Sequence, residues 1–598
     1  MAVNPINPMV VQSDKTVLLE VDNPQYAEAR DALARFAELE KSPEHIHTYR
    51  LSPLSLWNAA ASGLTADAIV DSLMRFSKYD VPGNIQADVR DYVSRFGRLK
   101  LRPGVAGELL LTADDPLLML EVSRQRKVRP YILQEIDKHT VRVDPALRGH
   151  IKKALVDIGY PAEDLAGYVD GAGLPLQLRP VMRANQLPLA LRHYQQDAVE
   201  VFHAGGTARG GSGVIVLPCG AGKTLVGMGV MEKLQTNTLI LTTNTVAVRQ
   251  WMDELADKTS LDPNEIGEYT GDLKEIKPVT VTTYQILTYR QRRKRGAALA
   301  NGEGWIEEDV DDDLSTPLTP AVFPHFGLFR ERDWGLVIYD EVHLLPAPVF
   351  RMTAELQARR RLGLTATLVR EDGKEDHVFA LIGPKKYDVP WRDLERQGWI
   401  ATAHCHEIRL DMTPERRFSY ALAESREQIV ISATDPAKIS AVEQIIAKHP
   451  NDQVLVIGTY LDQLDEVANR LRAPLLTGKT PTRERQQLYQ QMRSGELRHL
   501  VVSKVANFAI DLPDVSVAIE ISGTFGSRQE EAQRLGRILR PKRDGRPAHF
   551  YAIVMRDTKD QTFGAKRQMF LTEQGYKYEI LYRDDLPNYD PERDHAGW

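Results

Sequence analysis

Cysteine is nearly absent from this 598-residue chain, which contains only Cys219 and Cys405. Two cysteines exclude a disulfide framework and a cysteine-based zinc or iron–sulfur site. No run approaches the ~18 consecutive apolar residues that a membrane helix needs. Residues 1–12 lack the basic and apolar segments of a secretory signal. We therefore expect a protein of a reducing, cytoplasmic compartment that makes no contact with a membrane.

A strong charge of either sign is also missing. The chain has 76 Lys and Arg against 82 Asp and Glu, a net charge of −6, and 42% hydrophobic residues, as ordinary globular proteins do. This balance leaves nucleic acid open as a partner, because local basic surfaces supply phosphate contacts. The length allows roughly four domains.

Short apolar runs alternate with longer amphipathic stretches through the middle and the C-terminal part of the chain. The first series of candidate strands covers residues 214–217, 238–242, 279–283, 336–339 and 362–366. The second covers 454–457, 500–502, 517–521 and 550–554. Runs that are apolar on both faces are typical of parallel strands. The fold class that we predict is α/β, with two tandem parallel-sheet domains after a mixed α+β N-terminal region.

The N-terminal third has a different pattern. We predict a strand at 16–21, a helix at 23–39 that starts with an Asn cap and a Pro, and two helices within 52–77 joined near Gly63. A hairpin is expected at 99–101 and 108–112. The predicted domains are 1–130, winged-helix-like; 131–185, small; 186–392, the first α/β domain; and 393–598, the second. Residues 291–322 read as a flexible, solvated insertion in the first α/β domain.

A phosphate-binding loop is predicted directly after the first strand. Residues 217–224 read Leu-Pro-Cys-Gly-Ala-Gly-Lys-Thr, and the nucleotide-binding positions are Gly220, Ala221, Gly222, Lys223 and Thr224. Glycines let backbone N–H groups surround phosphates, the lysine reaches the β- and γ-phosphates, and the threonine hydroxyl binds Mg²⁺. The strict pattern has Gly where Leu217 stands, but the strand–loop–helix context supports the assignment.

An acidic pair, Asp340 and Glu341, follows the predicted strand 336–339. ATP hydrolysis needs one carboxylate near Mg²⁺ and another beside the attacking water, and we assign Asp340 and Glu341 to these tasks. Next to them, His343 either couples the site to motion or is a satisfied polar residue.

A third motif lies in the second α/β domain, where residues 533–540 read Gln-Arg-Leu-Gly-Arg-Ile-Leu-Arg. Arg537 and Arg540 are three residues apart and share one helix face. Arginines brought in by another domain stabilise the transition state of phosphoryl transfer. Alone, this segment would read as a basic helix surface.

Together with Leu-Thr-Ala-Thr at 364–367, these motifs resemble superfamily 2 helicases with a DEAH-like box, and within them the XPB family. Arg370, Glu371 and Asp372 are similar to the RED motif that this family uses in DNA opening. Residues 503–513 resemble its motif V, and 565–576 its C-terminal tail. The resemblance implies two RecA-like domains and 3′–5′ polarity.

The N-terminal region also resembles the XPB family, at 17–21, 45–49 and 54–57. Residues 131–185 lie where the family places a damage-recognition domain. Arg192 and Gln195 resemble the Q-type motif and would bind the nucleotide, together with Gln533. A thumb-like element is placed at 411–436 by its position, by the pair Arg416–Arg417 and by Arg426.

Contacts with nucleic acid are expected at the carboxyl ends of strands, because open parallel sheets bind their ligands at this edge. The residues predicted to touch DNA or to couple it to the ATP site are Thr243, Thr283, His343, Thr365, Thr367, Arg370, Glu371, Asp372 and Lys504, with Asn244 and Tyr284 as neighbours.

The resemblance implies an ATP- and Mg²⁺-dependent DNA helicase of repair or transcription, acting on single-stranded, forked or bubble DNA. A repair nuclease or a transcription protein is the implied partner. Two alternatives stay open: a double-stranded DNA translocase or remodeller without strand separation, and an ATP-gated scaffold that recruits repair partners. Only the resemblance argues for DNA over RNA.

Overall fold

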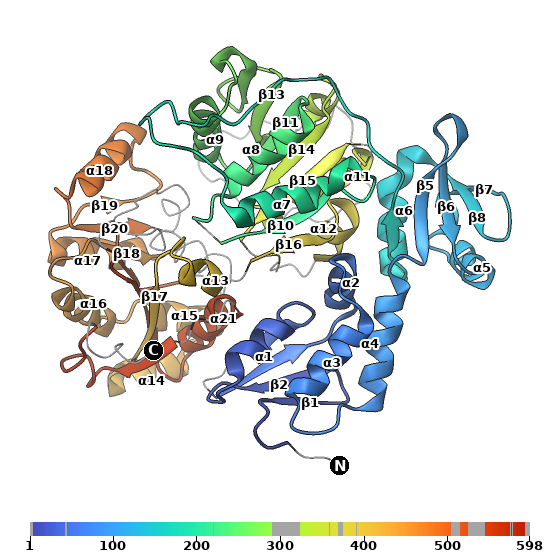
Figure 1. The fold of residues 1–598 in the computed structure, drawn as a ribbon. Helices are drawn as coiled ribbons and strands as arrows, with labels where there is room; N and C mark the ends of the chain where they lie inside the picture. The colour runs from blue at the N-terminus through green and yellow to red at the C-terminus, as the bar shows by residue number, and fades with distance from the viewer. Residues whose placement is uncertain are drawn as a thin grey trace, which may run out of the picture.

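The computed structural model describes residues 4–41, 45–218, 220–289, 323–357, 359–366, 368, 375–389, 391–503, 515–523, 545–573, 576 and 578–591. Four sheets organise this part of the chain, two large and two small (Figure 1). None of its helices has the length and apolar character needed to cross a membrane.

The first large sheet is parallel throughout and has seven strands. Their order is β12 (Ile266–Tyr269), β13 (Val279–Thr283), β11 (Thr238–Thr242), β14 (Leu336–Asp340), β15 (Arg360–Thr365), β10 (Ser212–Val216) and β16 (Lys385–Asp388). Its helices are α7 (His193–His203), α8 (Lys223–Leu234), α9 (Thr245–Lys258), α10 (Tyr284–Thr288), α11 (Ala347–Glu355) and α12 (Glu375–Leu381). All five predicted strands are confirmed, and β12 and β16 are additional edge strands.

The second large sheet repeats this architecture. Its order is β19 (Leu475–Leu476), β20 (His499–Ser503), β18 (Val454–Gly458), β21 (Val517–Glu520), β22 (Ala548–Met555), β17 (Ala403–Leu410) and β23 (Tyr578–Tyr582), all paired in parallel. Its helices are α14 (Pro414–Leu422), α15 (Ser425–Ala433), α16 (Ala437–Lys448), α17 (Leu461–Leu471), α18 (Thr482–Ser494) and α21 (Lys559–Glu573), and α13 (Trp391–Arg396) precedes the sheet. The predicted α/β class with two tandem parallel sheets is confirmed. The segment 411–436 holds the helix pair α14–α15.

The N-terminal sheet is antiparallel. Its strands run β1 (Met9–Val11), β2 (Thr16–Glu20), β4 (Ile46–Arg50) and β3 (Glu38–Lys41), and its helices are α1 (Tyr26–Leu33), α2 (Pro53–Ala61), α3 (Ala66–Phe76) and α4 (Gly83–Arg95). The predicted strand at 16–21 and the two helices within 52–77 are confirmed. The helix predicted to reach residue 39 is wrong in its second half: it ends at Leu33, and β3 pairs with β4, which buries Leu39 in the core of this domain.

The second small sheet has the order β7 (Ile132–Glu135), β8 (Thr140–Val143), β6 (Leu109–Ala113), β5 (Leu99–Pro103) and β9 (Ala162–Asp164), with α5 (Pro116–Arg124) and α6 (Arg148–Asp157). The predicted hairpin is confirmed as β5–β6. Strands from both sides of residue 130 share this sheet.

A buried ion cluster attaches this small sheet to the first large domain. Asp164 lies 2.7 Å from an Arg148 nitrogen and 3.0 Å from Lys152 Nζ. Lys152 also donates to Gln357 Oε1, just after α11, at 2.9 Å. Burial, opposed by Asp164, lowers the pKa of Lys152 to about 8. The contact between these two domains is therefore specific and polar.

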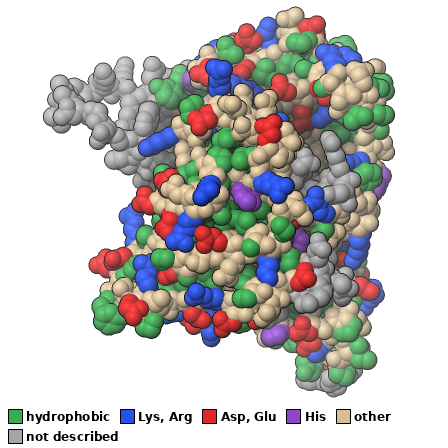
Figure 2. Space-filling model, turned by 90° about the vertical axis from the view of Figure 1, so that its left-hand side faces the viewer, with side chains coloured by type: hydrophobic (Ala, Val, Ile, Leu, Met, Phe, Trp, Pro, Cys, Tyr) green, Lys and Arg blue, Asp and Glu red, His purple; other side chains and the backbone are tan. Residues whose placement is uncertain are grey.

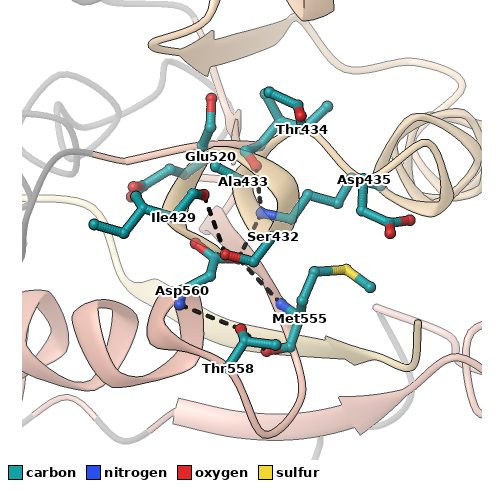
Figure 3. A network of polar contacts seen from close by, with 12 residues as sticks. Ile429, Ser432, Ala433, Thr434, Asp435, Glu520, Met555, Thr558 and Asp560 are labelled. Atoms are coloured by element: carbon teal, nitrogen blue, oxygen red, sulfur yellow. Dashed lines mark hydrogen bonds and ion pairs between the residues drawn. The ribbon is translucent and has the colours of Figure 1, made fainter. Parts of the chain in front are cut away.

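A buried polar network braces the second large domain. Lys438 Nζ on α16 donates to Asp560 Oδ2 at 2.7 Å and to the Ile521 carbonyl at 2.9 Å. Asp560 also accepts the Met555 N–H at the end of β22, so one carboxylate links α16, β22 and α21 (Figure 3). These charges neutralise each other inside the domain.

The N-terminal domain contacts both large domains. The Asn58 side chain on α2 accepts the Lys385 N–H of β16 at 2.9 Å, and Met569 of α21 packs into the N-terminal apolar core. Over the face of the molecule that Figure 2 shows, basic and acidic side chains are interspersed, in keeping with the small net charge.

Candidate active site

The predicted phosphate loop lies at the carboxyl end of β10. Leu217 continues the strand direction and is buried, Gly220 and Gly222 have φ of 82° and 80°, and α8 begins at Lys223. A Cβ on Gly222 would lie 2.5 Å from Gln195 Nε2. Gly222 is therefore required both for its left-handed backbone and for the close approach of α7. Cys219 lies outside the described residues.

Two side chains of α7 donate hydrogen bonds to the backbone of this loop. Gln195 Nε2 and the Tyr194 hydroxyl both donate to the Ala221 carbonyl, at 2.8 and 2.9 Å. Gln195 Oε1 accepts the Arg192 N–H at 2.9 Å, and the Arg192 guanidinium stands 4.3 Å from the Trp399 ring centroid. One end of the Gln195 amide thus holds the loop, and the other caps the start of α7.

The structure brings the acidic pair beside the loop lysine. Asp340 is the last residue of β14, and Glu341 adopts a left-handed φ of 50° that turns the chain sharply. Lys223 Nζ lies 3.4 Å from Glu341 Oε1, with the two side chains 11% and 19% exposed. The three predicted catalytic groups of the first domain therefore converge at one strand edge.

The pKa values of the two carboxylates are shifted in opposite directions. Burial and the adjacent Glu341 carboxylate raise the pKa of Asp340 to about 6. Burial also opposes the ionisation of Glu341, but the Lys223 ammonium and His343 bring the pKa of Glu341 below its ordinary value. Two crowded acids beside one lysine form a site whose negative charge favours an added cation.

His343 links the acidic pair to the next strand. Its Nδ1 lies 2.6 Å from Thr365 Oγ1 at the end of β15 and 3.6 Å from Glu341 Oε2, and both His343 and Thr365 are buried. This contact joins the acidic pair to the first threonine of Leu-Thr-Ala-Thr, and the coupling role of His343 stays a prediction.

The residues predicted to touch DNA differ in exposure. Thr243 is partly exposed at the end of β11, and the Asn244 side chain caps α9. Thr283 is 4% exposed and its hydroxyl accepts the Ile286 N–H, so it serves as the cap of α10. The buried Tyr284 donates its hydroxyl to the Asp340 carbonyl at 2.8 Å.

Several predicted residues lie outside the described part of the chain: Thr367, Arg370, Glu371, Asp372, Lys504, Gln533, Arg537 and Arg540. Their roles stay predictions.

Three contacts were missed by sequence reasoning. Tyr194 supports the phosphate loop, Tyr284 fixes the backbone of Asp340, and Trp251 Nε1 on α9 donates to Asp340 Oδ2 at 2.9 Å. Trp251 and Asp340 are 89 positions apart in the chain, and no motif spacing connects them.

The oxygen donors at this edge suit Mg²⁺. The Thr224 hydroxyl in the first turn of α8 and the Asp340 carboxylate are hard ligands, and Mg²⁺ usually takes one or two protein oxygens together with phosphates and water. The described residues contain no group of three or more His, Cys, Asp or Glu side chains arranged as a complete metal cage. A shared protein–phosphate site fits both observations.

Comparison with known proteins agrees with this geometry. Residues 394–594 match the family model described as ERCC3/RAD25/XPB C-terminal helicase, 188–370 match "Type III restriction enzyme, res subunit", and 9–137 match "Helicase conserved C-terminal domain". The protein named "DNA 3′-5′ helicase XPB" from Kineococcus radiotolerans is 52% identical over 98% of both chains. The chain belongs to the XPB family of helicases. Another member, under the same name in Mycobacterium tuberculosis, is 54% identical over 97% of this chain and 98% of its own.

The XPB family match extends to eukaryotes. A relative from Enterocytozoon bieneusi is 32% identical over 96% of this chain and 92% of its own length. It is named as the XPB helicase/translocase subunit of general transcription and DNA repair factor IIH. The chain therefore spans nearly the full length of these XPB proteins, including their N-terminal regions.

Proposed function

We propose that the chain is an ATP-dependent DNA helicase with 3′–5′ polarity, in which ATP is hydrolysed at the carboxyl edge of the first large sheet. The observation that carries this proposal is the meeting of Lys223, Asp340 and Glu341 beside a glycine loop, within a chain of the XPB family. A helicase of this kind is a hydrolase of an acid anhydride.

The geometry suggests an order of events in the site. The β- and γ-phosphates of ATP replace Glu341 as the partner of Lys223. Glu341, released from the ammonium, then accepts a proton from the attacking water, whose oxygen bonds to the γ-phosphorus while the bond from that phosphorus to the bridging oxygen breaks and ADP leaves. Mg²⁺, held by Thr224 and Asp340, would neutralise the phosphate oxygens.

The second large domain supplies the remaining parts. We assign Arg537 and Arg540 as arginine fingers and Gln533 as a nucleotide contact, brought to the first domain when ATP closes the two sheets. Thr243, Thr283 and Lys504 are assigned to the DNA track, and His343, Thr365 and Thr367 to coupling. The predicted boundary at 130 is wrong, because it would divide the sheet that β5 and β6 share with β7, β8 and β9. The boundaries at 185 and 392, with a thumb at 411–436 and an insertion at 291–322, are part of the same proposal.

DNA that is single-stranded, forked or in a bubble is the substrate we propose, in a cytoplasmic compartment. The names of the bacterial relatives support DNA as the substrate and 3′–5′ as the polarity. The names of the eukaryotic relatives point to a role in DNA repair and transcription. We propose a repair nuclease or a transcription protein as the partner.

ATP turnover by the purified chain tests this function. Turnover is measured alone and with single-stranded DNA, forked DNA or RNA, for the natural chain and for Lys223→Ala. We expect DNA to stimulate turnover more than RNA, and Lys223→Ala to lose at least about 100-fold, the typical loss of one transition-state donor. Lys233→Ala, at the other end of α8, is the matched control that should retain activity. Turnover indifferent to every nucleic acid would favour the scaffold.

Translocation on duplex DNA is the second candidate, since the relatives from Enterocytozoon bieneusi and baker's yeast are named helicase/translocase subunits. The proposed opening element, Arg370 to Asp372, separates the two. Arg370→Ala should keep most of the ATP turnover and lose strand separation on forked DNA. Equal loss of both activities would argue against an opening role for this triplet.

A further inference from the structure

Trp251 makes a direct contact with the proposed metal ligand. It lies in α9, is 2% exposed, and its Nε1 is 2.9 Å from Asp340 Oδ2. The indole N–H is a donor only, and a buried donor requires an acceptor. In this structure the acceptor is a carboxylate, which makes the hydrogen bond charge-assisted and strong.

The fold holds the indole ring rigidly. A Cβ on Gly227 of α8 would lie 2.7 Å from Trp251 Cη2, and Leu364 of β15 closes in on the same spot. Because Gly227 has no side chain, the indole ring of Trp251 can pack directly against the backbone of α8. Because the ring is held between α8 and the sheet, its N–H has one direction, toward Asp340.

Three hydrogen bonds fix Asp340 from different sides. Its Oδ1 accepts the Glu341 N–H at 3.1 Å, its Oδ2 accepts Trp251, and its carbonyl accepts the Tyr284 hydroxyl at 2.8 Å. Each carboxylate oxygen keeps a lone pair, since one such oxygen accepts about two hydrogen bonds or ligands. The remaining lone pairs are thus aimed in a fixed direction.

We propose that Trp251 is a positioning residue that sets the orientation in which Asp340 binds Mg²⁺. The inference rests on the proposed role of Asp340 as the magnesium ligand. It also connects two sites: Asn244, at the predicted DNA track, caps α9, and the second turn of α9 carries the indole that holds the metal ligand. A shift of α9 on DNA would move this indole and so reach the magnesium site.

The test is nucleotide binding with and without magnesium. Affinity for a fluorescent, non-hydrolysable ATP analogue is measured in Mg²⁺ and in EDTA for the natural chain and for Trp251→Phe, which keeps a ring but removes the donor. We expect the EDTA affinity to stay within about twofold and the gain in affinity from Mg²⁺ to fall about 10-fold or more, as for other groups that orient metal ligands. The Mg²⁺ concentration for half-maximal ATP turnover should rise in parallel.

Two further variants make the result decisive. Trp334→Phe removes a buried indole donor that bonds the Leu328 carbonyl and not Asp340, and should leave the Mg²⁺ gain unchanged. Gly227→Ala places a methyl group where the indole of Trp251 packs while keeping its N–H, and should reduce the Mg²⁺ gain as Trp251→Phe does.

Asp340→Asn separates the two possible failures. If Asp340→Asn abolishes the Mg²⁺ gain while Trp251→Phe and Gly227→Ala preserve it, the role of Trp251 is overturned. If Asp340→Asn itself preserves the gain, the metal role of Asp340 in the proposed function fails first.

Discussion

The fourth strand of each large sheet ends on a carboxylate, and the two carboxylates have neighbours of opposite charge. Asp340 ends β14 in the first sheet, beside the like charge of Glu341. Glu520 ends β21 in the second sheet and lies 3.0 Å from the Arg567 guanidinium of α21, with both side chains almost fully buried. The same topological position therefore carries an acid crowded by another acid in one domain and a neutralised acid in the other.

This difference distinguishes a ligand-binding sheet edge from one whose buried charges serve the structure alone. In the second sheet, Lys438–Asp560 and Arg567–Glu520 close the carboxyl edge with pairs that need no ligand. In the first sheet, one lysine faces two carboxylates, and the pKa of Asp340 is raised to about 6. Both domains have the same fold, so the fold by itself does not create an active site. The unbalanced charge of two carboxylates beside one lysine, at the carboxyl edge of the first sheet, marks the candidate site.

Removing one partner of a buried ion pair in the second large domain should have the largest effect on stability. Glu520→Gln leaves the buried Arg567 guanidinium without its carboxylate partner, and removing one member of a buried pair costs about 3–5 kcal/mol. Denaturant unfolding of the variant, followed by a probe in the second domain, measures this loss. Glu466→Gln, whose partner Arg470 is exposed on α17, is the control and should change stability by less than about 0.5 kcal/mol. A Glu520 variant as stable as the control would remove the contrast between the two sheets.

A second internal pairing should appear in the pH dependence of stability. Burial opposes the ionisation of Asp452, but hydrogen bonds with His449 and Ser516 lower the pKa of Asp452 to about 2. Because the folded pKa lies below the ordinary value of about 3.9, this stabilisation is fully present above pH 4 and is lost as the pH falls toward 2. Asp452→Asn should lower stability by about 1 kcal/mol at neutral pH, after allowance for solvent screening.

Urea midpoints between pH 6 and pH 3 measure this dependence. The difference between the natural chain and Asp452→Asn should shrink below pH 4. A difference that stays constant down to pH 3 would mean that the carboxylate charge makes no contribution.

The smallest effect on stability is expected at the active site itself. Asp340→Asn removes a carboxylate that is crowded by Glu341, so unfolding should change by less than about 1 kcal/mol, or the chain should gain stability. Thermal unfolding without nucleotide or Mg²⁺ measures this. A loss as large as that of Glu520→Gln would show that Asp340 is a structural acid like its counterpart.

Sequence reasoning located the five interior strands of the first large sheet and four of the five in the second, because these strands are apolar on both faces. It missed the interior strand β17, in which His404, Glu407 and Arg409 interrupt the apolar pattern, and the edge strands β12, β16, β19 and β23. It extended the helix after Asn23 too far, because pairing with β4 overrides the helical pattern near residue 38.

At the active site, the glycine loop and the acidic pair were predictable because phosphate chemistry fixes their residue types and spacing. Trp251 was not, since its contact depends on how α9 packs against Gly227 of α8. Thr283 satisfied the rule for strand ends, yet its hydroxyl caps a helix. Motifs whose residue types and spacing are fixed by chemistry can be predicted from a sequence, whereas contacts that depend on how helices pack cannot.

Met569 has a consequence for how the chain folds during its synthesis. The N-terminal apolar core includes this methionine, which lies on α21, more than 470 positions after α4 ends at Arg95. At about 5–20 residues per second, the ribosome needs on the order of half a minute or more to cover that distance. During this time the N-terminal core lacks the Met569 side chain, so the apolar side chains that Met569 covers stay exposed until α21 has been made.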